Sequence, residues 1–501
     1  MSGSVLTFHT ARCYNIKQNT ITVKGASIME MLEKSAAFGY FCEISAIPRG
    51  SGNEAAIAAY IENFAKAHGL YVMRDLSNSV LVRRPAAAGF EKLPSVLLQG
   101  HTDMVCEKTP DSNHDFLKDG IKVIVDGNVI RADRTTLGGD DGAAVAVMLA
   151  LLADESFAAP TLECLFTSGE ETALVGASNF DYSNISARRM INLDTEGEGE
   201  AIAGSAGGVR VRITSRPEYE PAPESMHIVS FELGGLFGGH SGCEINAGRL
   251  SACAEGVRFL NSQGVRLCEI SGGNMDNAIA REFSAKVAVA DPEAFGRAAT
   301  EFERGLLSRA TEADRGLFVK TSPASSDRVM TARSSDSVLE FAAGVFHGVY
   351  SMSKDMEGLV QTSANLASFK NSGGELTITV SARSSVDAEL EKLKAELAER
   401  AKAFGLSVSF EGQYPGWQFD PDSRLARVFL REYKKQTGKD GRVNAVHAGL
   451  ECGIIKSAIP DMDIISIGPN MYDIHTPNER MEADSFLRFE TLVRMMILDF
   501  E

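Results

Sequence analysis

Residues 95–103 of the chain read Ser-Val-Leu-Leu-Gln-Gly-His-Thr-Asp. An apolar, branched run of this length that ends in glycine predicts a buried strand. In open α/β sheets, ligands bind at the carboxyl ends of such strands. His101 and Asp103 stand at this end, and because side chains alternate along a strand, they point to the same side. His-x-Asp triplets are frequent by chance, so the pair gains its meaning from the rest of the chain.

Two further apolar strands end in the same way. Residues 162–166 are followed by Glu170 and Glu171, and residues 190–193 are followed by Asp194. Paired glutamates usually belong to a solvated surface, but this pair follows an apolar strand. Imidazole and carboxylate groups at the ends of three strands therefore predict one shared site in an α/β domain.

A glycine-rich segment, Gly-Gly-Asp-Asp-Gly at residues 138–142, leads into an apolar helix predicted at residues 143–152. Two acids at the start of a helix can satisfy its free N–H groups and complement its dipole. The surrounding glycines instead favour an unusual backbone that lies close to something bound. The residues alone leave both interpretations of Asp140 and Asp141 open.

The composition limits the classes of protein that fit. The 501 residues are 44% hydrophobic and 23% charged, which suits a globular chain of two or three domains. The net charge of −17 argues against a nucleic-acid partner. The eight cysteines are scattered without a Cys-x-x-Cys pair, which predicts reduced thiols in a cytoplasmic protein. The longest apolar run, residues 142–153, is too short to span a membrane, and we expect no secretory signal.

The pattern along the chain changes twice. Residues 1–28 are polar and predict a flexible N-terminal extension. After an α/β pattern, residues 208–411 alternate strands and helices in a way that predicts two small α+β, ferredoxin-like lobes. The α/β pattern then returns. We therefore expect a mixed-sheet α/β catalytic domain, formed by residues 29–207 and 412–501, with a two-lobed lid domain inserted into it.

The polar residues at the strand ends, together with His475 in a late loop, form a donor set for metal ions. Imidazole and carboxylate ligands suit Zn²⁺, Mn²⁺ or Co²⁺. Two ions roughly 3.5–4 Å apart can share one water and lower its pKa, and Asp140 on its glycine-rich loop suits a bridging position. Adjacent Glu170 and Glu171 point in different directions, so one can bind metal while the other acts as general base.

Several segments resemble the motifs of the M20 metallopeptidases in order and spacing, most closely those of the aminoacyl-histidine dipeptidases within that family. The main segments are residues 101–103, 139–142, 169–171, 193–196 and 474–477. Supporting segments are residues 238–242, 272–281, 414–417 and 447–453. The resemblance extends from about residue 30 to the end of the chain, and it implies a di-zinc peptidase catalytic domain that carries a lid.

The resemblance also implies a role for each candidate in the catalytic domain. His101 and Asp194 would hold one metal ion, and Glu171 and His475 would hold the other. Asp140 would bridge the two ions, and the peptide bond that follows it would be cis. The two remaining carboxylates would act on other groups, with Asp103 orienting His101 and Glu170 serving as general base and later as acid.

In the lid, the resemblance implies that His240 stabilises the oxyanion of the tetrahedral intermediate. Asn277 and Arg383 would hold the substrate ends, with Arg383 on the free carboxylate. The sequence departs from the family pattern at Asp141, where relatives usually carry Asn, and at Gly169, where they carry an acid or Thr. An extra carboxylate beside the metals could alter the metal preference.

We therefore expect a cytoplasmic enzyme that hydrolyses unblocked dipeptides, Xaa-His dipeptides included. It would use two divalent metal ions, zinc or alternatively manganese or cobalt, and a shared water deprotonated by Glu170. Dipeptides are the expected partners, without nucleic acid or membrane, and both a monomer and a homodimer fit the sequence. One alternative is an aminoacylase or amidohydrolase of the same fold that acts on N-acyl amino acids. The other is a non-catalytic binding protein.

Overall fold

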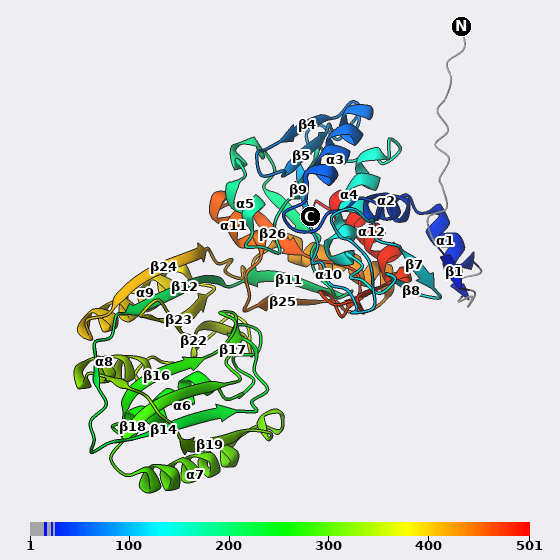
Figure 1. Ribbon diagram of the computed structural model, residues 1–501. Helices are drawn as coiled ribbons and strands as arrows, with labels where there is room; N and C mark the ends of the chain where they lie inside the picture. Colours follow the sequence, from blue (N-terminus) through cyan, green and yellow to red (C-terminus); the bar gives the residue numbers. More distant parts are fainter. Residues whose placement is uncertain (1–14, 18–21, 24–25, 501) are drawn as a thin grey trace. The chain divides into compact units, whose positions relative to one another are not determined.

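The structure is a computed structural model of the chain, and it describes residues 15–17, 22–23 and 26–500. The chain divides into two compact units (Figure 1). Unit 1 consists of Met1–Ala203, Asp420–Asn444 and Ile454–Glu501, and unit 2 consists of Gly204–Phe419 and Ala445–Gly453. The insertion predicted at residues 208–411 lies within unit 2. Most of the extension predicted at residues 1–28 lies outside the described residues.

An eight-stranded sheet forms the centre of unit 1, in the order β25-β11-β26-β10-β6-β9-β5-β4. The four strands from β26 to β9 are parallel to one another, whereas β11 pairs antiparallel with β26, β5 with β9, and β4 with β5. The predicted mixed-sheet α/β fold is therefore confirmed. The strands are β4 (Tyr71–Arg74), β5 (Val80–Arg84), β6 (Val96–His101), β9 (Leu162–Thr167), β10 (Arg189–Asn192), β11 (Glu200–Ser205), β25 (Arg442–Val446) and β26 (Asp463–Ser466).

Both faces of this sheet are covered. Val96 and Leu98 belong to the main core of the unit, and Leu97, which points to the opposite face, is also fully buried. Near-continuous apolar strands of this kind are typical of parallel sheets with helices on both sides. The helices are α1 (Ile28–Lys34), α2 (Ala36–Ser45), α3 (Ala55–Ala67), α4 (Gly139–Ala153), α5 (Val175–Asn179), α10 (Arg424–Thr437), α11 (Glu451–Ala458) and α12 (Ala483–Leu498).

A smaller, five-stranded sheet of unit 1 has the order β1-β7-β8-β28-β27. It joins an antiparallel hairpin, β7–β8, to the C-terminal pair β27–β28. The loop between β27 and β28 contains His475, so this sheet anchors one of the candidate site residues. The strands are β1 (Asn15–Lys17), β7 (Ile124–Asp126), β8 (Val129–Arg131), β27 (Met471–Tyr472) and β28 (Arg480–Glu482).

Strand β6 and helix α4 approach each other closely at Gly100. A Cβ atom on Gly100 would lie 2.5 Å from the Cβ of Ala144 and 2.5 Å from Oδ2 of Asp141. We expect Gly100→Ala to lower the free energy of unfolding by about 1–3 kcal/mol, because the added methyl overpacks the core. Urea unfolding followed by circular dichroism measures this change.

Gly39→Ala in α2 is the matched control, since a Cβ there would meet no atom within 4 Å. Alanine in a helix is more favourable than glycine, so we expect this variant to be as stable as the wild type or more stable. Equal stability of the Gly100→Ala and Gly39→Ala variants would contradict the tight β6–α4 contact.

Unit 2 is organised on a nine-stranded sheet. Its main order is β19-β14-β18-β16-β22-β23-β12-β24, and β21 pairs with β22 beside it. The two predicted lobes share this one sheet, because β16 of the first half pairs with β22 of the second at Gly272 and Phe369. The strands are β12 (Gly207–Ser215), β14 (His227–Gly234), β16 (Arg266–Gly272), β18 (Phe283–Val289), β19 (Phe318–Pro323), β21 (Gly348–Met352), β22 (Val360–Ser372), β23 (Glu375–Ser384) and β24 (Ser407–Tyr414).

The helices of unit 2 share one core with the sheet. Residues from all four, including Phe259 and Leu393, pack with strand residues such as Phe231 and Ile378. Two short strand pairs complete the unit, β13 (Tyr219–Pro221) with β20 (Arg328–Met330) and β15 (Gly239–His240) with β17 (Ala278–Ile279). The helices are α6 (Ala252–Ser262), α7 (Pro292–Arg309), α8 (Ala332–Ala343) and α9 (Asp387–Ala403).

Candidate metal centre

Three neighbouring parallel strands of unit 1 end at the same edge of the sheet. β6 ends at His101, β9 ends just before Glu170 and Glu171, and β10 ends just before Asp194. Parallel strands in register deliver the residues after their carboxyl ends to one place. The side chains that the sequence pattern groups together therefore lie next to one another.

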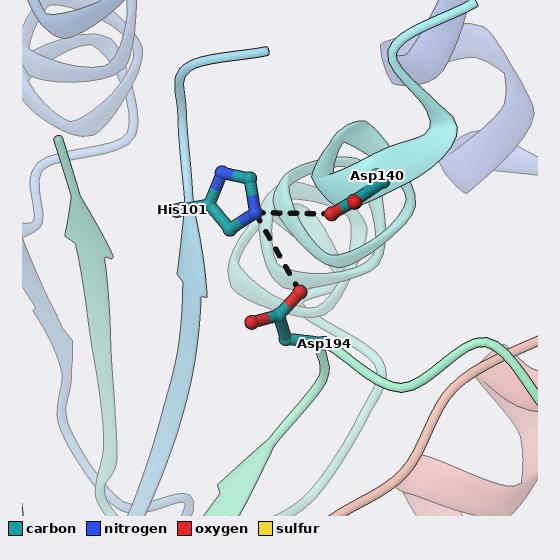
Figure 2. A group of neighbouring side chains, drawn as sticks. All are labelled: His101, Asp140 and Asp194. Atoms are coloured by element: carbon teal, nitrogen blue, oxygen red, sulfur yellow. Dashed lines mark hydrogen bonds and ion pairs between the residues drawn. The ribbon is translucent and has the colours of Figure 1, made fainter. Parts of the chain in front are cut away.

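The first group of possible ligands consists of His101, Asp140 and Asp194 (Figure 2). Nε2 of His101 lies 3.0 Å from Oδ1 of Asp140 and 3.5 Å from Oδ1 of Asp194. The ring is buried, with an exposed fraction of 1%. One nitrogen and two carboxylate oxygens thus converge on a small, enclosed volume, which is a donor set that zinc and related ions accept.

The second group consists of Asp140, Glu171 and His475. Nε2 of His475 lies 3.1 Å from Oδ2 of Asp140 and 2.9 Å from Oε1 of Glu171. Asp140 therefore presents Oδ1 to one imidazole and Oδ2 to the other. A carboxylate that is shared in this way has the geometry of a bridging ligand between two ions.

The other two carboxylates lie beside these groups. Asp103 faces Nδ1 of His101, with its Oδ1 at 3.4 Å. The same carboxylate accepts hydrogen bonds from the backbone N–H groups of Glu170 and Glu171 and from the hydroxyl of Ser51. Glu170 offers an oxygen within 4.8 Å of donor atoms of His101 and Glu171. Asp103 thus contacts both the imidazole of His101 and the backbone of Glu170 and Glu171.

The electrostatics of the cluster favour added positive charge. Burial and neighbouring carboxylates raise the pKa of Asp194 to about 6, although contact with His101 opposes this shift. Hydrogen bonds to Asp140 and Glu171 raise the pKa of His475 to about 10. Carboxylates outnumber imidazoles here, so bound cations would relieve the repulsion between the acids. The residues present therefore fit divalent metal ions.

Asp141 has a different environment from Asp140. Its Oδ2 accepts the backbone N–H of His101 and its Oδ1 accepts that of Ala144, so it caps α4 and faces the backbone. Burial and the carboxylate of Asp194 raise the pKa of Asp141. It belongs to none of the ligand groups found among the described residues. The peptide bond between Asp140 and Asp141 is cis, as the resemblance implies.

Two buried charged residues that the sequence pattern does not single out hold the loop before Asp140. The guanidinium of Arg49 donates to the carbonyls of Gly138, Thr102 and Asp103. Glu479 accepts backbone N–H groups of the same loop. The exposed fractions of Arg49 and Glu479 are only 2% and 3%. Both stand in polar loops without an adjacent apolar run, so no local pattern indicates their burial.

Arg49 also explains the glycines of this loop. Gly138 has φ +66°, and a Cβ there or at Gly142 would lie 2.6 Å from Nη2 of Arg49. The glycines at these two positions thus make room for the Arg49 side chain, and not for a bound molecule.

Three candidate residues lie in unit 2. His240 is next to Asn277 in the fold, because the N–H of Ser241 donates to the carbonyl of Asn277. Nδ1 of His240 accepts hydrogen bonds from the N–H groups of Gly242 and Cys243, at 3.3 and 3.0 Å. Burial and the Arg383 guanidinium lower the pKa of His240. The ring is therefore neutral near pH 7 and carries its proton on Nε2, where it can donate.

Arg383, near the end of β23, is 7% exposed. One of its terminal nitrogens donates to the hydroxyl of Tyr414 at 2.8 Å, whereas its Nε–H has no acceptor among the described residues. Burial, Arg383 and His240 together lower the pKa of the adjacent His447 to about 3. Arg383 is thus a buried cation beside neutral rings, with an N–H left to bind an anionic group.

Residues 97–499 match the sequence description of peptidase family M20/M25/M40. The chain belongs to this family. The sequence resemblance is therefore confirmed, and so is the prediction that the protein is an enzyme that hydrolyses peptide bonds. The matched residues include all the candidate site residues of this M20 peptidase, from His101 to His475.

One curated relative of the M20 peptidase is the cytosol non-specific dipeptidase of Escherichia coli. It is 33% identical over 478 residues, which cover 94% of this chain and 99% of the relative. Among solved structures, the aminoacylhistidine dipeptidase of Vibrio alginolyticus superposes with a TM-score of 0.86 at 31% identity. That match covers 94% of this chain and 98% of the other.

The aminopeptidase PepT of Bacillus cereus matches 93% of this chain and 98% of its own, with a TM-score of 0.55 at 16% identity. At that identity the match shows a shared fold alone. No helix within residues 26–500 of the M20 peptidase has the length and apolar character that crossing a membrane requires.

Proposed function

We propose that this M20 peptidase is a dipeptidase that uses two divalent metal ions and cleaves unblocked dipeptides, Xaa-His dipeptides among them. The main support for the proposal is the geometry of Asp140. Its two carboxylate oxygens face His101 and His475 separately. The names of the E. coli and Vibrio relatives support the dipeptide substrate. The name of the E. coli protein also supports a cytosolic location.

The donor set favours zinc, with manganese or cobalt as alternatives. His101 and Asp194 would hold one ion, Glu171 and His475 the other, and Asp140 both. Two ions held in this way would polarise the scissile carbonyl and lower the pKa of the attacking water. Imidazole ligands make a site for magnesium or calcium less favourable, because these ions prefer oxygen ligands.

Glu170 is the proton-transfer group in this proposal. Its backbone is fixed by the bond from its N–H to Asp103, and its carboxylate reaches the ligand groups. It accepts a proton from the water that attacks the peptide carbonyl. It then donates that proton to the nitrogen of the leaving amino acid, which departs as a neutral amine.

His240, Asn277 and Arg383 are the residues that recognise the substrate in this proposal. The neutral His240 donates its Nε2–H to the oxygen that becomes negative as the carbonyl is attacked. Arg383 binds the free carboxylate of the dipeptide with the N–H that has no acceptor among the described residues. Asn277 holds the other end of the substrate. A buried Arg–carboxylate contact selects substrates that end one residue after the scissile bond.

Hydrolysis assays on metal-stripped protein test this function. We expect activity to return with Zn²⁺, Mn²⁺ or Co²⁺ and to be highest on Ala-His, β-Ala-His and Ala-Ala. Ala-Ala-Ala and N-acetyl-His should be cleaved at least tenfold more slowly, since they lack the free carboxylate or the free amine next to the scissile bond. Initial rates at fixed enzyme and metal concentration measure the preference.

The same panel separates the alternatives. Cleavage of N-acetyl-His alone would identify an aminoacylase of the same fold. No cleavage of any substrate, with no metal bound, would point to a non-catalytic binding protein. The M20 peptidase heated to denature it, with the same metals added, is the control for hydrolysis by the metals themselves.

A further inference from the structure

The carboxylate of Glu479 is bonded to the loop that leads into helix α4. Its Oε2 accepts the N–H groups of Leu137 and Gly138 at 2.7 and 3.0 Å. Its Oε1 accepts that of Gly139 at 2.7 Å and lies 3.4 Å from that of Asp140. Buried backbone N–H groups outside a regular helix or strand need other acceptors. Here one buried carboxylate, more than 300 residues away in the sequence, accepts four consecutive N–H groups of this loop.

Arg49 holds the same loop from its other side. It donates to the carbonyl of Gly138 and also to those of Thr102 and Asp103, directly after His101. The loop that presents Asp140 is therefore fixed through its carbonyl by Arg49 and through its N–H groups by Glu479. Because Arg49 binds the end of β6 as well, these contacts set the position of Asp140 relative to His101.

Glu479 is also tied to His475. The two residues belong to one tight turn, in which the N–H of Glu479 donates to the carbonyl of Thr476 at 3.1 Å. The hydroxyl of Thr476 donates to the carbonyl of Asp473 and accepts the N–H of Asn478. A displacement of the Glu479 carboxylate would therefore change the distance between Asp140 and His475, which lie in the same ligand group.

We propose that Glu479 is a positioning residue for the second metal site, formed by Asp140, Glu171 and His475. The inference rests on the proposed function, because it assumes that this group holds an ion. Glu479 contributes no ligand atom to the groups found among the described residues. It acts through the loop that carries Asp140 and the turn that carries His475.

Glu479→Gln tests this role with little change of shape. The amide keeps one acceptor oxygen and turns an NH₂ donor toward N–H groups, so about half of the bonds to the loop are lost. We expect the larger of the two metal dissociation constants, that of the weaker site, to rise by about 10–100-fold. A loss of this size is usual when a group that supports metal ligands is removed. The tighter constant should rise by a smaller factor, because Asp140 belongs to both groups but His101 and Asp194 are not bonded to Glu479. Equilibrium dialysis of metal-stripped protein against Zn²⁺ measures both.

Glu163→Gln is the matched control. Glu163 is also a fully buried carboxylate, and it accepts the N–H groups of Ser186 and Ala187. It lies near the start of β9, whereas Glu170 follows the end of that strand. We expect both dissociation constants of this variant to equal those of the wild type.

Excess Zn²⁺ should restore kcat of the Glu479→Gln variant, which a general loss of structure would not permit.

Arg49→Lys is the second variant, because it alters the same loop from the carbonyl side. Because Asp140 belongs to both ligand groups, this variant should also weaken metal binding, even if Glu479→Gln fails to fold. Wild-type protein that binds two ions, together with both variants binding them equally well, would overturn the inference and leave the proposed function intact. Wild-type protein that binds no ion would overturn the proposed function, and the inference with it.

Discussion

Replacing Glu170 with glutamine is expected to lower kcat by at least a hundredfold, while two metal ions stay bound. The amide has the size of the carboxylate but cannot accept a proton from water, and general acid–base catalysis contributes about 10²–10⁴-fold. In this variant, His101 keeps its nearest oxygens, which come from Asp140 and Asp194. His475 likewise keeps those of Asp140 and Glu171, so both groups retain their ligands. Steady-state kinetics and metal analysis of the same preparation check both parts of the expectation.

The control for this experiment is Glu155→Gln, an exposed glutamate shortly after α4 that should leave kcat and metal content unchanged. A Glu170→Gln variant with near-normal turnover would show that another group moves the proton. If the variant loses one metal ion, the result would instead indicate that Glu170 is a ligand. Glu171 would then be the next candidate for the general base.

Replacing Asp140 with alanine is expected to have a larger effect than any change to a single-site ligand. Its Oδ1 and Oδ2 serve different groups, so the variant loses a ligand from both. The ions contribute several kcal/mol to the stabilisation of the transition state, and each 1.4 kcal/mol is about tenfold in rate, so we expect a loss of about a thousandfold or more. Metal content should fall below two ions per chain.

The neighbouring Asp141→Asn is the matched comparison. Its carboxylate bonds to the backbone N–H groups of His101 and Ala144, and an asparagine can still accept one of them. We expect this variant to keep two ions and at least a tenth of the activity. If Asp140→Ala retained two ions, or if Asp141→Asn lost them, the bridging position would be assigned to the wrong aspartate.

The sequence predicts much of this centre because its residues follow apolar strands. Runs such as residues 96–100 are recognisable by composition, and once they are parallel neighbours, His101, Glu171 and Asp194 must meet at one edge. For Asp140 the residues alone leave two interpretations open, and the resemblance to the M20 metallopeptidases assigns it the bridging position. These predictions depend on local patterns and on one general rule for parallel sheets.

Other features depend on contacts between distant segments that leave no local pattern. Arg49 and Glu479 are buried and both bond to the loop from Leu137 to Asp140, which lies far from each of them in the sequence. In unit 2, the pairing of β16 with β22 joins two segments that each resemble a complete lobe. A hydrophobic pattern identifies which face of a strand is buried, but it does not specify the neighbouring strand.

The position of β26 in the first sheet has a consequence for how the protein is made. This strand lies between β10 and β11, but it is synthesised after the whole of unit 2. At ribosomal speeds, roughly ten seconds to a minute separate the emergence of β10 from that of β26. During that interval β10 has a free, apolar edge, which is a template for association with other chains. The strand that leads to Asp194 is thus a part of the nascent chain that chaperones are expected to protect.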